Sequence, residues 1–391
     1  MTTTASRNIA FFRNDTNGQE VLFADPEHVL IAWDADSFRT ALAQAEAAQR
    51  AGKWLAGYLS YEAGYLLDPA LERLLPEGRR APLICMGVFA GPVEPTAAGF
   101  GDIADPSNSW LADPRATWSE ADYAQRFDKL HQHLRQGDCY QANLTFPVEA
   151  RWEGDPFAIF RSMVARQPVR YGTFIDLGVD AGGPVVLSRS PELFFEVDDD
   201  RWIKALPMKG TAPRGASAGE DEAQKTFLAN DPKNQAENRM IVDLLRNDIS
   251  RISEVGTLDV PELFAIETYP TLHQMVSRVR ARLLDGIGFS EILAALFPCG
   301  SITGAPKISA MKILNDLERT PRNVYCGAIG WAAPSGHMRF SVAIRTVSLY
   351  PGGEAVYNVG GGVVFDSTAE GEYEECLLKG RFATGKPPAS S

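Results

Sequence analysis

Three glutamates on two predicted helices are the first candidates for chemistry. Glu237 lies in the run ENRMIVDLLRND, four residues before Ile241 and seven before Leu244, so it shares their stripe on the helix. Glu372 and Glu375 stand three residues apart in GEYEE and point to one side of a second helix. Buried carboxylates need a partner, and hard oxygen ligands from two helices suit Mg²⁺. The alternative is an acidic helix face that only contacts water.

A lysine in the run LPMKGT is the second candidate. Lys209 follows Leu206, Pro207 and Met208 at the end of a predicted strand. A lysine amine that is removed from water has a lowered pKa and can act as a nucleophile or base. The alternative is an edge lysine whose ammonium group reaches the solvent.

Glycine-rich turns offer backbone amides for an anion. In GSITGAPK, residues 300–307, Pro306 stands where a helix would begin, so the amides around Gly304 are available to an anion. This run is not a phosphate-binding loop, because Lys307 does not directly follow a glycine. The run 360–362 is Gly-Gly-Gly after strand-like sequence, without G-x-G-x-x-G spacing. Ordinary tight turns are the alternative for both segments.

Three single polar residues stand in apolar surroundings: His273 in YPTLHQMVSRV, Glu192 in SRSPELFF and Arg345 in FSVAIRTVSL. Each is more often structural than catalytic when it is read alone. Arg345 is the most informative, because an arginine inside a strand-like run needs a carboxylate.

Helices and strands must alternate to position these candidates. We expect helices at about 37–50, 119–136, 156–167, 219–230, 233–247, 289–297, 306–319 and 368–379, with capping boxes that begin at Ser119 and Ser367. We expect strands at 54–65, 82–89, 139–152, 185–197, 201–210, 324–332, 338–350 and 354–365. This mixture favours an α+β fold over a doubly wound sheet.

Composition excludes several classes of protein. The 391 residues are 45% hydrophobic and 23% charged, as in globular proteins. No apolar run reaches the roughly 18 residues that span a bilayer, and the N-terminus is not a secretory signal. Five scattered cysteines without a C-x-x-C pair indicate a reduced, cytoplasmic protein. The net charge of −12 disfavours nucleic-acid binding, so an anionic substrate needs a locally positive site.

The chain is expected to form one intertwined globular unit with two regions. Residues 91–117 are rich in Gly, Pro, Ala, Asp and Ser and are the best linker candidate. We therefore expect a smaller N-terminal region at 1–115 and a larger catalytic region at 116–385. Residues 386–391 are expected to fray.

Eight motifs occur in the order found in chorismate-binding enzymes, and the chain resembles this family over about residues 118–380. The motifs are YQANL, SRSPELF, LPMKGTAPRG, AENRMIVDLLRND, GSITGAPK, YCGAIGW, FSVAIRT and GGGVVFDS…GEYEE. The resemblance implies an anthranilate-synthase-component-I-like fold, with two orthogonally packed antiparallel β-sheets flanked by helices.

The resemblance also implies a role for each candidate residue. Glu237, Glu375 and Glu372 match the residues that bind Mg²⁺ in this family, and the metal holds the ring carboxylate of chorismate. Glu192 matches the acid that protonates the departing ring hydroxyl, and His273 matches the active-site histidine of the family. The residues that match substrate-binding positions are Arg345, Tyr325, Thr211, Gly304, Gly360, Gly361 and Gly362.

Two positions separate the branches of the family. Lys209 is similar to the lysine of aminodeoxychorismate synthases, whereas anthranilate synthases usually carry alanine there. Gln141 stands where water-adding isochorismate and salicylate synthases carry a lysine base. The chain therefore resembles the aminodeoxychorismate synthase component I branch, which serves 4-aminobenzoate and folate biosynthesis. One departure is Asn234, where several members carry an acidic residue.

The resemblance implies a reaction with ammonia. The Lys209 amine would attack ring carbon 2, and ammonia would then attack carbon 4 to give 4-amino-4-deoxychorismate. The chain has no Cys nucleophile in a G-x-C-x-G elbow, so ammonia is expected from a glutamine amidotransferase subunit, component II, or from solution. The alternatives are anthranilate or aminodeoxyisochorismate synthesis and, from another class, a non-catalytic binding subunit.

Overall fold

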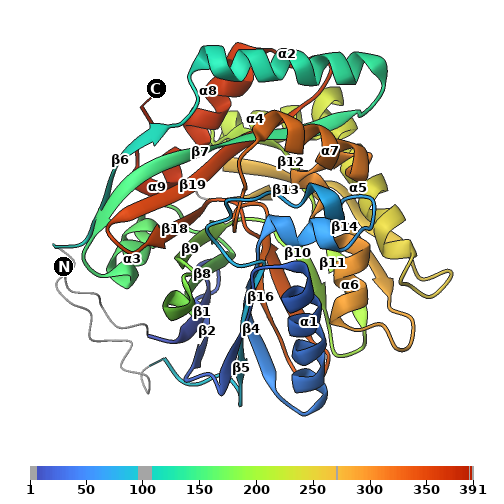
Figure 1. Ribbon diagram of the computed structural model, residues 1–391. Coiled ribbons are helices and arrows are strands. Elements are labelled where there is room, and N and C mark those ends of the chain that lie inside the picture. The colour runs from blue at the N-terminus through green and yellow to red at the C-terminus, as the bar shows by residue number, and fades with distance from the viewer. Residues whose placement is uncertain (1–6, 96–107, 270–271, 387, 390–391) are drawn as a thin grey trace.

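Two antiparallel β-sheets with helices on their outer sides make up the protein (Figure 1). The computed structural model describes residues 7–95, 108–269, 272–386 and 388–389. Strands β7 and β19 of one sheet run across the direction of β4 and β16 of the other. The predicted α+β class is confirmed.

The first sheet has nine strands in the order β15-β7-β19-β18-β9-β8-β1-β2, and β6 also pairs with β7. These strands are β1 (Ile9–Asn14), β2 (Gln19–Ala24), β6 (Trp110–Ala116), β7 (Gln141–Glu153), β8 (Tyr171–Asp176), β9 (Val185–Ser190), β15 (Gly304–Ala305), β18 (Thr346–Tyr350) and β19 (Glu354–Val363).

The second sheet has ten strands in the order β12-β14-β11-β10-β17-β16-β4-β5-β3, and β13 also pairs with β14. These strands are β3 (His28–Ala32), β4 (Trp54–Leu59), β5 (Ile84–Phe89), β10 (Leu193–Val197), β11 (Trp202–Ala205), β12 (Met208–Pro213), β13 (Asp259–Thr268), β14 (Leu272–Arg282), β16 (Ala328–Ala332) and β17 (Met338–Val342).

The helices lie close to their predicted positions. They are α1 (Ala35–Arg50), α2 (Glu120–Gln136), α3 (Pro156–Arg166), α4 (Ala218–Asn230), α5 (Pro232–Ser250), α6 (Phe289–Leu296), α7 (Lys307–Glu318), α8 (Ala369–Lys379) and α9 (Arg381–Thr384). Short 3₁₀ helices include η1 (Tyr61–Leu66), η2 (Glu72–Leu74), η4 (Val179–Ala181) and η5 (Gly300–Ile302). Within the described residues, every helix is too short or too polar to cross a membrane.

Three hydrophobic clusters hold these layers together. Between the sheets, Phe23 and Ile175 of the first sheet pack with Tyr58 and Ile329 of the second. A second cluster joins the outer side of the first sheet to α2, α3, α7 and α8. A third joins the second sheet to α1, α5 and α6. Burial of apolar surface on both sides of each sheet therefore fixes where the helices and crossovers can lie.

Helix α2 illustrates how local sequence determines an element. Ser119 and Asp122 form the predicted capping box, in which Ser119 Oγ accepts from the Asp122 amide and the Asp122 carboxylate accepts from the Ser119 amide. Tyr123 and Phe127 begin the buried stripe, and Gly137 ends the helix at φ +78°. In α8, by contrast, the N-cap is Thr368 rather than the predicted Ser367.

Two predicted strands are each divided between the sheets. The run 185–197 becomes β9 in the first sheet and β10 in the second, and the run 338–350 becomes β17 and β18. The chain crosses between the sheets twice here, from β9 to β10 and from β17 to β18. These two crossovers lie side by side, because the Val342 amide donates to the Glu192 carbonyl and the Arg189 amide donates to the Arg345 carbonyl. The structure thus places Glu192 and Arg345 where the chain passes between the sheets.

The ends of the predicted regions differ from expectation. The linker candidate 91–117 contains strand β6, and its part at 96–107 lies outside the described residues. In the segment expected to fray, Ala389 exchanges backbone hydrogen bonds with Pro114 and Ala116, because the open edge of β6 offers free backbone groups. The N-terminal region contributes to both sheets, since β1 pairs with β8 and β4 pairs with β16.

Candidate functional site

The Lys209 amine lies against a glycine of strand β19. A Cβ atom built on Gly362 would lie 3.0 Å from Lys209 Nζ and 2.8 Å from Gln141 Nε2. The pairing of β19 with β7 sets Gly360, Gly361 and Gly362 opposite residues 145, 144 and 143. The absence of a side chain at residue 362 therefore lets the lysine and the glutamine approach the same stretch of backbone.

The surroundings of Lys209 favour the neutral amine. Burial lowers the pKa of the Lys209 amine below its ordinary value, and the nearby Lys379 charge acts in the same direction. The carboxylates of Glu237, Glu192 and Glu375 oppose the fall. The predicted nucleophile is thus an amine with a lowered pKa, and three predicted acidic residues lie close enough to act on it.

Glu192 is a buried acid held by a serine of the GSITGAPK segment. Its side chain is 5% exposed, and Oε1 accepts a 2.7 Å hydrogen bond from Ser301 Oγ. Burial raises the pKa of Glu192 to about 7, although the hydrogen bond from Ser301 and the charge of Lys209 lower it. A carboxyl group with this pKa can hold a proton and donate it near neutral pH.

The GSITGAPK segment packs against the start of strand β7. Gly304 lies in β15 and pairs with Ala142, and a Cβ atom there would lie 2.3 Å from the Gln141 carbonyl oxygen. Its φ of +142° and this close approach both require glycine. The segment thus packs its backbone against the start of β7 and points Ser301 at Glu192.

The three predicted metal ligands lie on α5 and α8. Burial raises the pKa of Glu372, and the nearby charges of Glu375 and Glu237 add to the rise. Burial would also raise the pKa of Glu375, but the Lys379 ammonium, 2.7 Å away, holds it below its usual value. These carboxylates therefore lie close enough to influence the pKa of one another.

Two of these carboxylates already interact with other side chains of the protein. Glu375 is paired with Lys379, whose Nζ also donates to the Gly360 carbonyl over 3.1 Å. Glu372 Oε1 accepts a hydrogen bond from Ser367 Oγ. Among the residues that the structure describes, no three His, Cys, Asp or Glu side chains form a group that could hold a metal. Carboxylate oxygens are suitable ligands for Mg²⁺. Lys379 would have to move away from Glu375 before a metal could bind that carboxylate.

Arg345 has a guanidinium group without a protein partner in the described part of the chain. It sits at the second crossover with φ +52°, and its side chain is partly buried. Burial lowers the pKa of this guanidinium, and neither an ion pair nor a side-chain hydrogen bond offsets the desolvation. The carboxylate that an arginine in this run needs is therefore left for a ligand to supply.

The other predicted residues have different surroundings. Both ring nitrogens of His273 are engaged, by Thr268 Oγ1 at 3.0 Å and Asp221 Oδ1 at 2.9 Å. Thr211 Oγ1 donates to Gln274 Oε1. Tyr325 is buried beside the chain turn at Arg322. As placed, His273, Thr211 and Tyr325 make no hydrogen bond to Lys209 or Glu192 within the described residues.

Three residues of the site were not predicted as site residues. Ser301 donates a hydrogen bond to Glu192, Lys379 forms an ion pair with Glu375, and Gln141 keeps both side-chain amide atoms buried without a partner in the described structure. Lys379 follows Glu375 by four residues, a helical pairing that the sequence does signal. Ser301 and Glu192 are 109 residues apart, so their contact has no local signal.

Sequence comparisons identify relatives over most of the chain. The profile of the family described as chorismate binding enzyme matches residues 103–385. Aminodeoxychorismate synthase component 1 of Klebsiella aerogenes is 43% identical over 265 residues, 68% of this chain and 57% of the relative. The Escherichia coli protein of that name is 40% identical over 68% of this chain and 58% of the relative. The chain thus spans a little under three fifths of these relatives.

Related enzymes with another name also match. Anthranilate synthase component 1 of Methanothermobacter marburgensis is 36% identical over 68% of this chain and 57% of the relative. Among solved structures, anthranilate synthase component I from Streptococcus pneumoniae superposes with a TM-score of 0.78 and 24% identity, over 98% of this chain and 93% of that one. The structural match confirms the fold that the resemblance implied.

Proposed function

This chain belongs to the chorismate-binding enzyme family, and from that premise we propose that it acts as an aminodeoxychorismate synthase component I. It would convert chorismate and ammonia to 4-amino-4-deoxychorismate and water. The observation that carries the proposal is the Lys209 amine, which has a lowered pKa and lies against Gly362. The acid Glu192 lies near enough for its charge to influence the pKa of this amine. Relatives at 40–43% identity carry the same name.

The reaction would proceed in two substitutions. In the first, the Lys209 amine forms a bond to ring carbon 2, the ring double bonds shift, and the hydroxyl leaves carbon 4 as water with the proton of Glu192. In the second, ammonia forms a bond to carbon 4, the double bonds shift back, and the Lys209 amine leaves carbon 2. The proton that the new amino group loses restores the acid form of Glu192. The enolpyruvyl group is retained throughout.

Binding of the dianionic substrate would use groups that the protein leaves unsatisfied. The unpaired Arg345 guanidinium suits the enolpyruvyl carboxylate, with Tyr325, Thr211 and the backbone at Gly304 and 360–362 as further candidates. Glu237, Glu372 and Glu375 would hold Mg²⁺, which supplies positive charge for the ring carboxylate. His273 would contribute only after it releases Asp221 or Thr268.

Ammonia would come from a partner. The relatives are named component 1, which is consistent with a second component, and we propose that this is a glutamine amidotransferase subunit. Free ammonium would replace it in an assay of the chain alone.

The lysine mechanism is tested by replacing Lys209. We expect Lys209→Ala to lose most 4-amino-4-deoxychorismate formation, because no amine would remain to displace the hydroxyl. Lys204→Ala is the matched control, since Lys204 lies on β11, the strand that precedes β12 in the chain, and pairs with Glu196 instead. The measurement is turnover of chorismate with Mg²⁺ and excess ammonium, read by chromatography and mass. Wild-type rates in Lys209→Ala would overturn the adduct.

A further inference from the structure

Lys209 stands in a β-bulge of strand β12. The register of β12 against β14 shifts by one residue between Met208 and Thr211, so two residues of β12, Lys209 and Gly210, stand opposite a single residue of β14. Gly210 adopts φ +90°, and a Cβ atom there would lie 2.9 Å from Asn234 Oδ1 on α5. A bulge bends its strand and changes the direction of its side chains. The direction of the Lys209 side chain therefore depends on the contacts that hold this bulge.

Gln274 of β14 holds the bulge with both ends of its side-chain amide. Its Nε2 atom donates a 2.7 Å hydrogen bond to the Gly210 carbonyl, and its Oε1 atom accepts a 3.1 Å hydrogen bond from Thr211 Oγ1. These partners are the two residues that follow Lys209, one inside the bulge and one at its end. Because the amide uses a donor for one residue and its acceptor for the next, it fixes the two residues relative to each other.

His273, the neighbour of Gln274 on β14, has other partners. Successive side chains of a strand point to opposite faces of the sheet. His273 is fully buried, and its two ring nitrogens are engaged by Thr268 of β13 and Asp221 of α4. Gln274, not His273, thus forms the side-chain hydrogen bonds to the residues that follow the predicted nucleophile.

We propose that Gln274 is a positioning residue whose two hydrogen bonds hold the bulge in the conformation that directs the Lys209 amine to the backbone of Gly362. The inference rests on the proposed function, in which this amine attacks ring carbon 2. The fit is close, because a Cβ atom on Gly362 would lie 3.0 Å from Lys209 Nζ. A misplacement of about 1 Å in a reacting group can slow a reaction about 100-fold. Gln274 acts through Lys209, so its loss should slow the chemical step and leave the binding of chorismate unchanged.

Gln274→Met tests this role by comparing kcat with KM. Methionine keeps the length of the side chain and removes both hydrogen bonds. With chorismate, Mg²⁺ and saturating ammonium, we expect kcat to fall about 10- to 100-fold and KM for chorismate to stay within about twofold. A wild-type kcat would overturn the proposal. A rise in KM at unchanged kcat would also overturn it, because Gln274 would then be a substrate contact.

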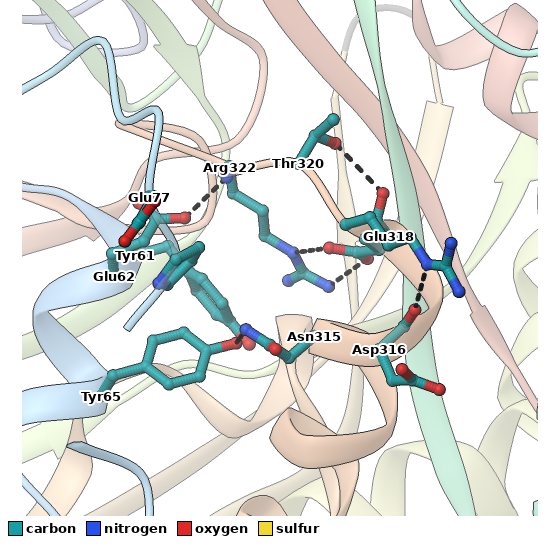
Figure 2. A pocket seen from close by; sticks show the side chains of 11 residues that line it. Tyr61, Glu62, Tyr65, Glu77, Asn315, Asp316, Glu318, Thr320 and Arg322 are labelled. Atoms are coloured by element: carbon teal, nitrogen blue, oxygen red, sulfur yellow. Dashed lines mark hydrogen bonds and ion pairs between the residues drawn. The ribbon is translucent and has the colours of Figure 1, made fainter. Parts of the chain in front are cut away.

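Asn315 provides the matched control. Its side-chain amide also bonds a backbone carbonyl and a hydroxyl, since Nδ2 donates to the Leu74 carbonyl over 2.9 Å and to Tyr65 Oη over 3.3 Å. Figure 2 shows Asn315 beside Tyr65 at a cavity of about 400 Å³, which Glu62 and Arg322 also line and which shares no residue with the site described above. Asn315→Leu should lower stability and keep the wild-type kcat. An equal loss of kcat in both variants would assign the effect to general destabilisation and overturn the proposal.

Hydrogen exchange tests the bulge without turnover. Measured by mass spectrometry, the backbone amides of residues 208–213 should exchange several-fold faster in Gln274→Met than in the wild type. In Asn315→Leu they should exchange at the wild-type rate. Unchanged exchange in Gln274→Met would overturn the proposal, even if kcat falls. Faster exchange in Gln274→Met, in a chain whose wild type does not convert chorismate, would support the hold on the bulge and refute the proposed function.

A second variant keeps the test decisive if Gln274→Met does not fold. Thr211 is exposed, and Thr211→Val removes only the hydroxyl that donates to Gln274. Because the hydrogen bond to Gly210 remains, we expect kcat to fall several-fold and exchange over residues 208–213 to become faster. Unchanged kcat together with unchanged exchange in Thr211→Val would overturn the proposal.

Discussion

Replacing Ser301 by alanine should change the acidity of Glu192 and little else. Ser301 Oγ donates to Glu192 Oε1 over 2.7 Å, and both side chains are buried. A hydrogen bond to a charged group contributes about 1.5–3 kcal/mol, and one between neutral groups about 0.5–1.5 kcal/mol. The serine therefore favours the ionised acid by about 1–1.5 kcal/mol, which corresponds to about one pH unit. Ser301→Ala should raise the pKa of Glu192 by that amount from its present value of about 7.

Two assays measure this shift. Glu192 acts as an acid in the proposed reaction, so kcat/KM should fall as pH rises through its pKa, and in Ser301→Ala this fall should move about one pH unit upward. Titration of ¹³C-labelled glutamate carboxyls by NMR reports the same group without turnover. Thr303→Val is the control, because Thr303 Oγ1 is equally buried in this segment but donates to the Cys299 carbonyl. An unmoved pKa in Ser301→Ala, or an equal shift in Thr303→Val, would refute the assignment.

Three further predictions follow from the geometry. Gly362→Ala would place Cβ 3.0 Å from the Lys209 amine and 2.8 Å from the Gln141 amide nitrogen, so turnover should fall about 100-fold. Gly219→Ala, whose Cβ would have no neighbour within 4 Å, should keep the wild-type turnover. Arg345→Ala should raise KM for chorismate about 10- to 100-fold, and Arg345→Lys should recover only part of this loss; an unchanged KM would remove its substrate role. Glu318→Gln breaks a buried ion pair and should lower the free energy of unfolding in urea by about 3–5 kcal/mol, and a loss below 1 kcal/mol would contradict that reasoning.

Local signals in the sequence predicted the helices well. The capping box at Ser119 and the apolar stripe from Tyr123 onward lie within a few residues of one another, so the start and buried face of α2 could be predicted. The apolar neighbours of Lys209 left open either a desolvated amine or an edge lysine, and the lowered pKa favours the first. Each of these features depends on residues close in the chain.

The crossovers and the partners across the site could not be predicted. The runs 185–197 and 338–350 each have enough apolar residues for one strand, and only pairing of β10 with β17 and of β9 with β18 divides them. Glu192 and Ser301 are 109 residues apart, and Glu62 and Arg322 are 260 apart. The engagement of His273 by Asp221, 52 residues away, likewise has no local signal. Contacts of this kind follow from the folded topology, not from residue spacing.

The most direct test of the account is the position of nitrogen in the product. The protein would be incubated with chorismate, Mg²⁺ and ¹⁵N-ammonium, and the product would be examined by NMR and mass spectrometry. We predict 4-amino-4-deoxychorismate with ¹⁵N bonded to ring carbon 4 and the enolpyruvyl group intact. Nitrogen at carbon 2, with or without loss of pyruvate, would contradict the proposed function and the role of Lys209.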